Sequence, residues 1–347
     1  MRAAPGRRED KVRVAMSTDD NPALPKVVVV GCGRWGRNHV RNYAELGALA
    51  GIVDADQKLA AEQADRFGVP SLRFEDVLGD PRIAGLVFAL PPSQNVPLGQ
   101  RALEAGKDLF VEKPLALSVA DGERLCALAE RHGRVLMVGH ILQYHPAFVE
   151  LGRLVREGRL GRLMSLVSTR LDLGAIRREE DALWALAPHD ISMVLALLGT
   201  EPVRVEAFGG YHTHPAIADT TTVALTFADG ASAEIRSSWL HAFKEQRLVV
   251  AGTDAMAVFD DREPWERKLV LHAYRIAETG GTAIIDRAEP EPVPLEAGEP
   301  LRRECAHFLH SILSRAAPLS DGREGLRVLR VLQAATSVLR SCHQATR

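Results

Sequence analysis

The stretch that decides the fold of this chain is Val27-Val28-Val29-Val30-Gly31-Cys32-Gly33-Arg34-Trp35-Gly36. Four β-branched residues form a run long enough for a buried parallel strand, and a helical pattern follows the glycines up to about Leu46. A Gly-x-Gly-x-x-Gly loop says little alone, but between a strand and a helix it is typical of dinucleotide binding. We therefore expect residues 31–36 to hold a pyrophosphate, because a helix N-terminus offers N–H groups and a partial positive charge.

Each glycine of this loop has its own expected role. Gly31 permits the tight turn, Gly33 lets the backbone approach the pyrophosphate, and Gly36 lets the helix pack close to the strand. Asp54 ends the next expected strand, Leu49–Val53, about twenty residues further on. A carboxylate there accepts hydrogen bonds from both adenosine ribose hydroxyls and repels a 2′-phosphate. NAD is therefore favoured over NADP as the cofactor.

The first part of the chain alternates short apolar runs with helical patterns, and glycines end several of the helices. The expected strands are Val27–Val30, Leu49–Val53, Gly85–Leu90, Leu109–Val111 and Val135–Val138, with a weaker strand and turn over Ser71–Gly79. After the first helix, the expected helices are Gln57–Phe67, Val96–Ala105 and Val119–Arg131. Strands that alternate with helices at this spacing form βαβ units and a parallel sheet.

After about His145 the pattern changes to consecutive strands. Apolar spacing predicts helices over Ala147–Glu157, Trp184–Leu198 (interrupted near its start by Pro188), about Leu301–Arg315 and Gly325–Ser341. Period-two or β-rich runs predict strands over Leu163–Thr169, Val203–Gly209, Thr221–Phe227, Ala231–Trp239, Arg247–Ala251, Ala255–Phe259 and Lys268–Ala273. Strands without intervening helices imply an antiparallel sheet.

The expected architecture has two domains. Residues 26–145 form an α/β Rossmann domain with a parallel sheet. Residues 146–347 form an α+β domain with a large, mostly antiparallel open sheet, whose C-terminal helices pack back toward the Rossmann domain. Residues 1–25 are rich in Arg, Asp, Asn and Pro and lack the apolar core of a signal peptide. They are expected to be a disordered extension, with translation starting at Met1 or Met16.

The composition excludes several classes of function. The 347 residues carry a formal net charge of -2, so no basic field favours nucleic acid or a membrane surface. No apolar run approaches the ~20 residues that span a bilayer. The four cysteines are scattered and form no Cys-x-x-Cys pair, which argues against a disulfide framework and a zinc site and favours the cytoplasm.

Three further segments carry a family resemblance: Ala89-Leu90-Pro91-Pro92-Ser93 and Glu112-Lys113-Pro114, each at the end of an expected strand, and His189-Asp190 in the second domain. With the glycine loop and the β-rich second half, the chain resembles the Gfo/Idh/MocA oxidoreductases over about residues 26–342. Residues 143–148 and Leu183–Ile191 are similar to those of nucleotide-sugar 3-dehydrogenases, which oxidise the C3 hydroxyl of UDP-N-acetylglucosamine or its uronic acid. Deoxysugar 3-ketoreductases share much of this pattern.

The resemblance implies hydride transfer between a sugar carbon and nicotinamide. Oxidising an alcohol requires a proton to leave oxygen and the developing charge to be stabilised. Lys113 lies just past a strand end, where ligands of open α/β sheets bind, and His189 matches the family's catalytic histidine. Many relatives carry an Asp where this chain has Ala185, so either Lys113 or His189 can be the base.

The remaining candidate residues follow from the loop and the resemblance. The expected cofactor-binding residues are Gly31, Cys32, Gly33, Arg34, Trp35, Gly36, Asp54, Leu90, Pro91, Pro92, Asn95, Glu112 and Lys113. The expected substrate-binding residues are Lys113, Tyr144, Arg170, Asp172, Trp184 and His189. Structural alternatives stay open for several of them: a helix-start role for Asn95, a strand salt bridge for Arg170, and hinge packing for Tyr144.

The sequence leaves several hypotheses open about function and assembly. The leading one is an NAD-dependent oxidoreductase acting at C3 of a nucleotide-linked sugar. The alternatives are an inositol or free-sugar dehydrogenase, a deoxysugar 3-ketoreductase, and an NAD-binding regulatory protein. No metal site is expected, because the histidine pairs at 212/214 and 307/310 lack a neighbouring carboxylate or cysteine in sequence. Relatives assemble through the open sheet, which implies a homodimer or homotetramer.

Overall fold

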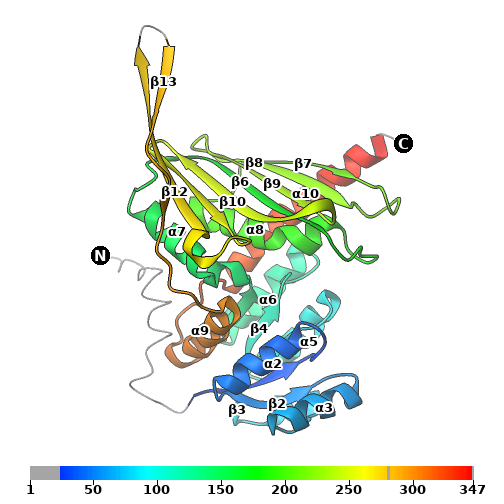
Figure 1. The fold of residues 1–347 in the computed structure, drawn as a ribbon. Coiled ribbons are helices and arrows are strands. Elements are labelled where there is room, and N and C mark those ends of the chain that lie inside the picture. The colour runs from blue at the N-terminus through cyan, green and yellow to red at the C-terminus, as the bar shows by residue number, and fades with distance from the viewer. Residues whose placement is uncertain (1–23, 280–281, 346–347) are drawn as a thin grey trace. The chain divides into compact units, whose positions relative to one another are not determined.

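The computed structural model describes residues 24–279 and 282–345 (Figure 1). The described chain divides into two compact units, and each is described by itself. The first unit contains residues 24–144 together with Gly298–Leu329, and the second contains residues 145–297, apart from 280–281, together with 330–345. The expected extension, residues 1–25, falls outside the described residues except for its last two.

The first unit is built on a five-stranded parallel sheet with strand order β2-β1-β3-β4-β5. The strands are β1 (Lys26–Val30), β2 (Leu49–Val53), β3 (Ile83–Phe88), β4 (Asp108–Glu112) and β5 (Leu136–Gly139). The helices are α2 (Gly36–Glu45), α3 (Gln57–Phe67), α4 (Phe74–Gly79), α5 (Pro92–Glu104) and α6 (Val119–Arg131). The second and third strands lie on opposite sides of β1, so the strand order reverses there, as at a ligand-binding switch point.

The prediction of a strand and turn over Ser71–Gly79 was wrong. Only Ser71 forms a bridge, to Ile52 of β2, and the segment from Phe74 onward is helix α4. Phe74, Val77 and Leu78 have helical spacing and pack into the core beneath the sheet. In so short a stretch, the spacing of three apolar residues is not enough to predict a helical turn rather than a strand.

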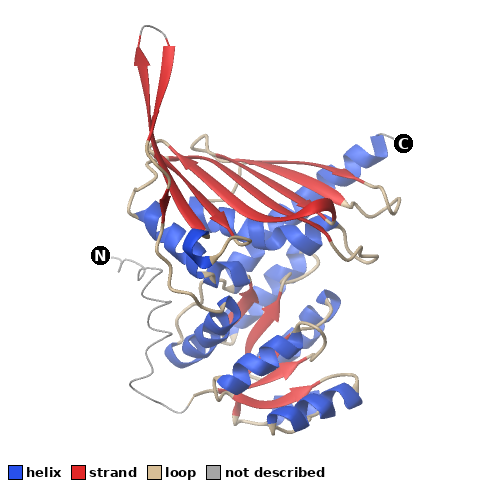
Figure 2. Ribbon diagram, viewed as in Figure 1, coloured by secondary structure: helices blue, strands red, loops and turns tan. Residues whose placement is uncertain are grey.

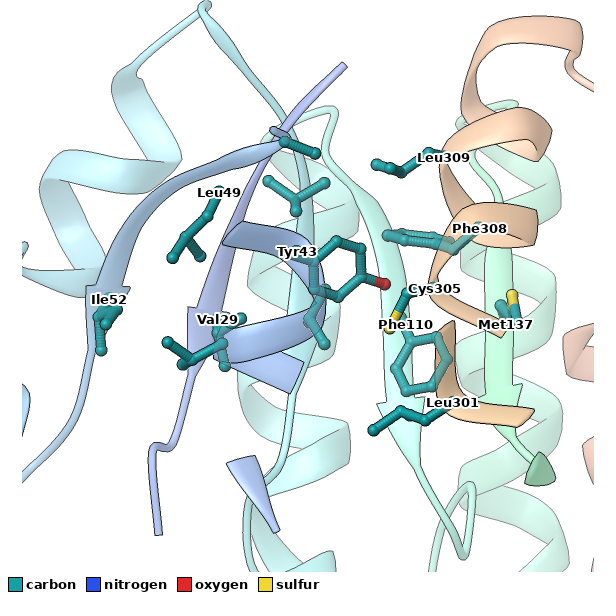
Figure 3. Close-up of a cluster of buried hydrophobic side chains, with 14 of the residues drawn as sticks. Val29, Tyr43, Leu49, Ile52, Phe110, Met137, Leu301, Cys305, Phe308 and Leu309 are labelled. Atoms are coloured by element: carbon teal, nitrogen blue, oxygen red, sulfur yellow. The ribbon is translucent and has the colours of Figure 1, made fainter. Parts of the chain in front are cut away.

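The sheet of the first unit carries an apolar core on each face. Alternate residues of β1 enter opposite cores, with Val27 and Val29 in one and Val28 and Val30 in the other. The first of these cores also receives Cys305, Phe308 and neighbouring side chains of α9 (Pro300–Ser314), as Figure 3 shows. The segment 298–329, assigned to the second domain from the sequence, therefore packs within the first unit.

The second unit is built on a large mixed sheet with strand order β13-β12-β11-β10-β6-β9-β8-β7, and β14 pairs with β12. Its strands are β6 (Leu163–Leu173), β7 (Arg204–Gly210), β8 (Thr220–Thr226), β9 (Ser232–Ser238), β10 (Leu240–Gly252), β11 (Ala255–Asp260), β12 (Leu269–Thr279), β13 (Thr282–Arg287) and β14 (Glu291–Pro292). All pairs are antiparallel except β6 with β9.

Helices α7 (Pro146–Arg156) and α8 (Ala182–Leu198) lie on one face of this sheet (Figure 2). Buried and exposed residues alternate along β9, as expected when helices cover a single face. The predicted strand at Arg247–Ala251 begins earlier, at Leu240, and β13 was not predicted. The side chains of β13 are all exposed, so its sequence carries no alternation to recognise. The last helix, α10 (Gly322–Ala345), begins in the first unit and ends in the second.

Candidate active site

The glycine loop lies at the carboxyl end of β1, and the structure separates the roles of its glycines. A Cβ on Gly31, whose φ is +90°, would lie 2.5 Å from the carbonyl oxygen of Ala89. A Cβ on Gly36 would lie 1.9 Å from the carbonyl oxygen of Gly31. A Cβ on Gly33 would meet nothing within 4 Å. The fold therefore requires two of the glycines, whereas the third leaves open space over the loop.

This loop has the features of an anion site. Helix α2 begins with no side-chain cap at Trp35 and no acidic residue in its first turn. No acidic residue of the helix itself therefore offsets its N-terminal dipole. Together with the space over Gly33, this arrangement fits the pyrophosphate of a dinucleotide.

Asp54, at the end of β2, is held in place by the same loop. Its Oδ2 accepts the backbone N–H of Cys32 at 2.7 Å, and its Oδ1 accepts that of Asp56 at 2.9 Å. Burial opposes ionisation, but these N–H groups outweigh it, so the pKa of Asp54 is lowered. The neighbouring Cys32 thiol has its pKa raised to about 12, first by burial and then by Asp54. Asp54 is therefore an oriented, ionised carboxylate beside a neutral thiol.

Lys113 directly follows β4, between Glu112 and a cis peptide bond to Pro114. Asn95 of α5 is fully buried, and its side-chain amide donates to the carbonyl oxygens of Glu112 at 3.3 Å and Pro114 at 3.0 Å. The amide of Asn95 thus fixes the backbone on both sides of the lysine. This role goes beyond that of a helix-start residue, and the predicted cofactor contact of Asn95 stays a prediction.

The Glu112 side chain faces helix α2. Its carboxylate accepts the indole N–H of Trp35 and lies 2.7 Å from Nε2 of His39. His39 is fully buried and was not among the predicted site residues. The available signal was weak, because a histidine three residues after the last glycine of the loop also suits an ordinary helix core.

In the second unit, His189 and Asp190 lie on α8. Asp190 is buried, and its carboxylate accepts a hydrogen bond from the Ser168 hydroxyl at 2.6 Å. It also accepts hydrogen bonds from Nε and Nη2 of Arg170, at 2.6 and 3.2 Å. Arg170 thus forms the salt bridge that the sequence left open as the alternative to a substrate contact. Ala185 packs in a small apolar cluster with Ala182 and Trp239.

The other predicted substrate residues have protein partners. Nε1 of Trp184 donates to Oγ1 of Thr336 at 2.9 Å. Asp172 lies 3.7 Å from Nζ of Lys244, with both side chains partly exposed. Tyr144 is fully buried, and its hydroxyl lies 3.0 Å from Oγ of Ser320. For Tyr144 the structure shows the packing role.

His145 lies where the chain passes from the first unit into the second. Its Nδ1 accepts the backbone N–H of Ala147 and caps α7, while Nε2 lies 3.2 Å from Asp261. Its ring stacks on Trp265. Burial opposes ionisation of Asp261, but hydrogen bonds from His145 and Lys268 outweigh it and lower the pKa to about 2. This cluster orders the start of α7.

Among the described residues, no three His, Cys, Asp or Glu side chains are grouped as metal ligands. A search of the helices over the same residues finds none that could cross a membrane.

The fold of each unit agrees with comparisons to known proteins. Residues 25–140 match a family model described as "Oxidoreductase family, NAD-binding Rossmann fold". Residues 148–258 match the "GFO/IDH/MocA C-terminal domain". The chain belongs to the Gfo/Idh/MocA oxidoreductase family and is an NAD-binding oxidoreductase of the sugar-dehydrogenase type.

Individual relatives are similar over most of their length. A UDP-N-acetylglucosamine 3-dehydrogenase from Acidithiobacillus ferrooxidans is 29% identical over 302 residues, covering 87% of this chain and 93% of that protein. Its solved structure matches with a TM-score of 0.82 and 26% identity, over 92% of this chain and 98% of that one. An inositol 2-dehydrogenase from Rhizobium meliloti is 27% identical over 68% of this chain and 76% of its own.

Replacing the loop glycines one at a time should separate folding from cofactor binding. Gly33→Ala should leave thermal stability unchanged, because its Cβ meets no protein atom within 4 Å, but weaken NADH binding by about tenfold or more. Gly36→Ala should lower the melting temperature, because its Cβ would clash with the backbone of Gly31. Thermal unfolding and NADH fluorescence titrations measure the two effects. NADH binding by Gly33→Ala at wild-type strength would contradict a pyrophosphate site over this loop.

Proposed function

We propose that this protein is an NAD-dependent dehydrogenase that oxidises the C3 hydroxyl of a nucleotide-linked sugar, or reduces the corresponding ketone. The observation that carries the proposal is the similarity of both units, over 87% of the chain, to a UDP-N-acetylglucosamine 3-dehydrogenase. Lys113, at the carboxyl end of β4 and on the same edge of the sheet as the cofactor loop, would supply the chemistry that such a reaction needs.

The cofactor assignment rests on the first unit. Residues 31–36 would hold the pyrophosphate, and Asp54 would accept the adenosine ribose hydroxyls. Because the lowered pKa of Asp54 keeps its carboxylate charged at neutral pH, a 2′-phosphate would be repelled. This supports NAD over NADP. Bound NAD supplies the nicotinamide carbon that accepts the hydride.

The protein's own groups would handle the alcohol oxygen and its proton. The ammonium of Lys113 holds the hydroxyl oxygen and stabilises the negative charge that develops as the hydride leaves. His189 accepts the hydroxyl proton, since imidazole is the side chain best suited to accept and release a proton near neutral pH. The reverse assignment, with neutral Lys113 as base and His189 orienting the alcohol, remains the alternative mechanism. Ala185 provides no carboxylate partner for the histidine.

A free cyclitol or sugar is the second candidate substrate, since an inositol 2-dehydrogenase is 27% identical to this chain. A deoxysugar 3-ketoreductase would use the same groups in the reducing direction. Formation of NADH, followed by its absorbance, decides among them. The proposal predicts turnover with UDP-N-acetylglucosamine or its uronic acid and little with myo-inositol. Turnover with myo-inositol alone would contradict the proposal and show that the protein is an inositol dehydrogenase.

Removing the Lys113 amine should slow the reaction strongly while leaving the cofactor bound. Lys113→Ala is expected to lower kcat by about a hundredfold or more, because the ammonium that holds the hydroxyl oxygen and stabilises its developing charge is lost. NADH affinity, measured by fluorescence, should change little. Lys26→Ala is the matched control: its amine bonds the carbonyl oxygen of Gly47, next to the amino end of β1. Equal kcat values for the two variants would exclude Lys113 from the chemistry.

We also propose that the protein is a homodimer or homotetramer formed through the open sheet. On β7, Ala207 is buried, whereas Phe208 is 65% exposed on the opposite face. A large exposed aromatic on an uncovered sheet suits a protein interface. Light scattering should give a mass of at least two chains for the wild type and a smaller mass for Phe208→Glu. A monomeric wild type would refute this assembly.

A further inference from the structure

Strand β4 carries a carboxylate at each end of one face. Asp108 begins the strand and Glu112 ends it, and Phe110 lies between them in the core shared with α2 and α9. Because side chains on a strand alternate, residues 108, 110 and 112 point to the same side. Asp108 pairs with Arg315, whereas Glu112 pairs with His39. Only Glu112 adjoins the lysine of the proposed reaction.

The contacts of Glu112 link two parts of the proposed cofactor site. One carboxylate oxygen, Oε1, accepts the indole N–H of Trp35 in the glycine loop and lies 2.7 Å from Nε2 of His39 in the helix that follows it. The other, Oε2, accepts the backbone N–H of Lys113 at 3.3 Å. The same side chain therefore touches the glycine-loop helix and the backbone of Lys113.

His39 is held firmly enough to act as the support for Glu112. The side chain is fully buried, and its ring lies edge-on to Phe110 with a centroid distance of 5.1 Å. Since Nε2 faces a carboxylate, that nitrogen carries the proton, and Nδ1 is an acceptor. Sγ of Cys305 lies 3.7 Å from Nδ1. Burial raises the pKa of Cys305 well above its usual value, so the thiol keeps its proton and can donate it to Nδ1.

The arrangement continues into the core. Figure 3 shows the hydroxyl of Tyr43 pointing toward Cys305. Glu304, the residue before Cys305, is also fully buried. Burial, and then the charge of Glu112, raise the pKa of Glu304. The Glu112 carboxylate itself faces the N–H donors of Trp35, His39 and Lys113.

We propose that His39 is a positioning residue for Lys113: the imidazole of His39 orients Glu112, which in turn fixes the backbone from which the lysine side chain extends. The proposal rests on the assignment of Lys113 to the reaction. A displacement of about 1 Å at a reacting group can cost about a hundredfold in rate. His39 therefore contributes to kcat without touching the cofactor or the sugar.

The kinetic test compares variants that differ only in the N–H donor of residue 39. His39→Leu removes the donor and is expected to lower kcat by about tenfold to a hundredfold, with KM and NADH affinity nearly unchanged. His39→Gln restores an N–H near the position of Nε2 and should recover much of the loss. Adding Glu112→Gln to His39→Leu should lower kcat little further, since both substitutions break the same contact between His39 and Glu112.

The matched control is Asp108→Asn, which breaks the buried pair with Arg315 on the same face of β4 but at the opposite end. It should lower the melting temperature while leaving kcat unchanged. If His39→Leu lowers stability as Asp108→Asn does but leaves kcat unchanged, His39 is merely structural and the proposal fails. A loss of NADH affinity in proportion to kcat would also overturn it.

A second measurement does not depend on the identity of the sugar. With NADH bound, acylation of Lys113 by acetic anhydride can be quantified by mass spectrometry, with Lys26 as the internal standard. His39→Leu should change the labelling rate of Lys113 relative to Lys26, whereas Asp108→Asn should not. If the wild-type protein oxidises none of the sugars tested, the proposed function fails, but a changed rate still supports the positioning role. An unchanged rate refutes that role.

Discussion

The parallel register of the first sheet is the constraint on which the proposed chemistry depends. Val30 of β1 is paired with Phe88 of β3, which is paired with Val111 of β4, so these three strands end at the same edge. The glycine loop, the Pro-Pro segment and Lys113, far apart in sequence, are consequently brought to one edge of the sheet. The close approach of Gly31 to the carbonyl oxygen of Ala89 shows how tightly the first two loops meet.

Hydrogen bonds fix the loops once the strands have aligned them. Asp54 binds the backbone of Cys32, and Asn95 binds the backbone on both sides of Lys113. Most of these hydrogen bonds join a buried side chain to a backbone group of another loop. They therefore restrain the backbone conformation of the loops. In the second unit, the pairing of Asp190 with Arg170 anchors α8 to β6 beside His189. Both proposed catalytic groups therefore extend from rigid supports.

Prediction from sequence succeeded where the signal was local. The glycine loop, the strand before it and the helix after it lie within a few residues of one another, and short-range sterics dictate their form. Short motifs also singled out Lys113 and His189, whose catalytic roles stay predictions. The pairing of Arg170 with Asp190 spans 20 residues and depends on how α8 lies over β6, so the sequence left it as one of two alternatives. His39 escaped notice because its partner is 73 residues away.

The same distinction explains the errors in the fold. The C-terminal helices were expected to pack toward the Rossmann domain but were assigned to the second domain. Helix α9 belongs to the first unit because Phe308 and Cys305 complete the core under β1 and β4, a long-range preference that helical periodicity does not reveal. The segment Phe74–Gly79 was mistaken for a strand because six residues are too few to establish a period. Strand β13 has no buried face and gave no alternation.

The central claim is that the hydride leaves C3 of a nucleotide-linked sugar, and isotopic labelling tests it most directly. The protein would be incubated with NAD and UDP-N-acetylglucosamine, or its uronic acid, carrying deuterium at C3, and the reduced cofactor examined by proton NMR. Deuterium is expected at C4 of the nicotinamide ring. Reduced cofactor that forms without deuterium would show that another carbon is oxidised and would contradict the claim.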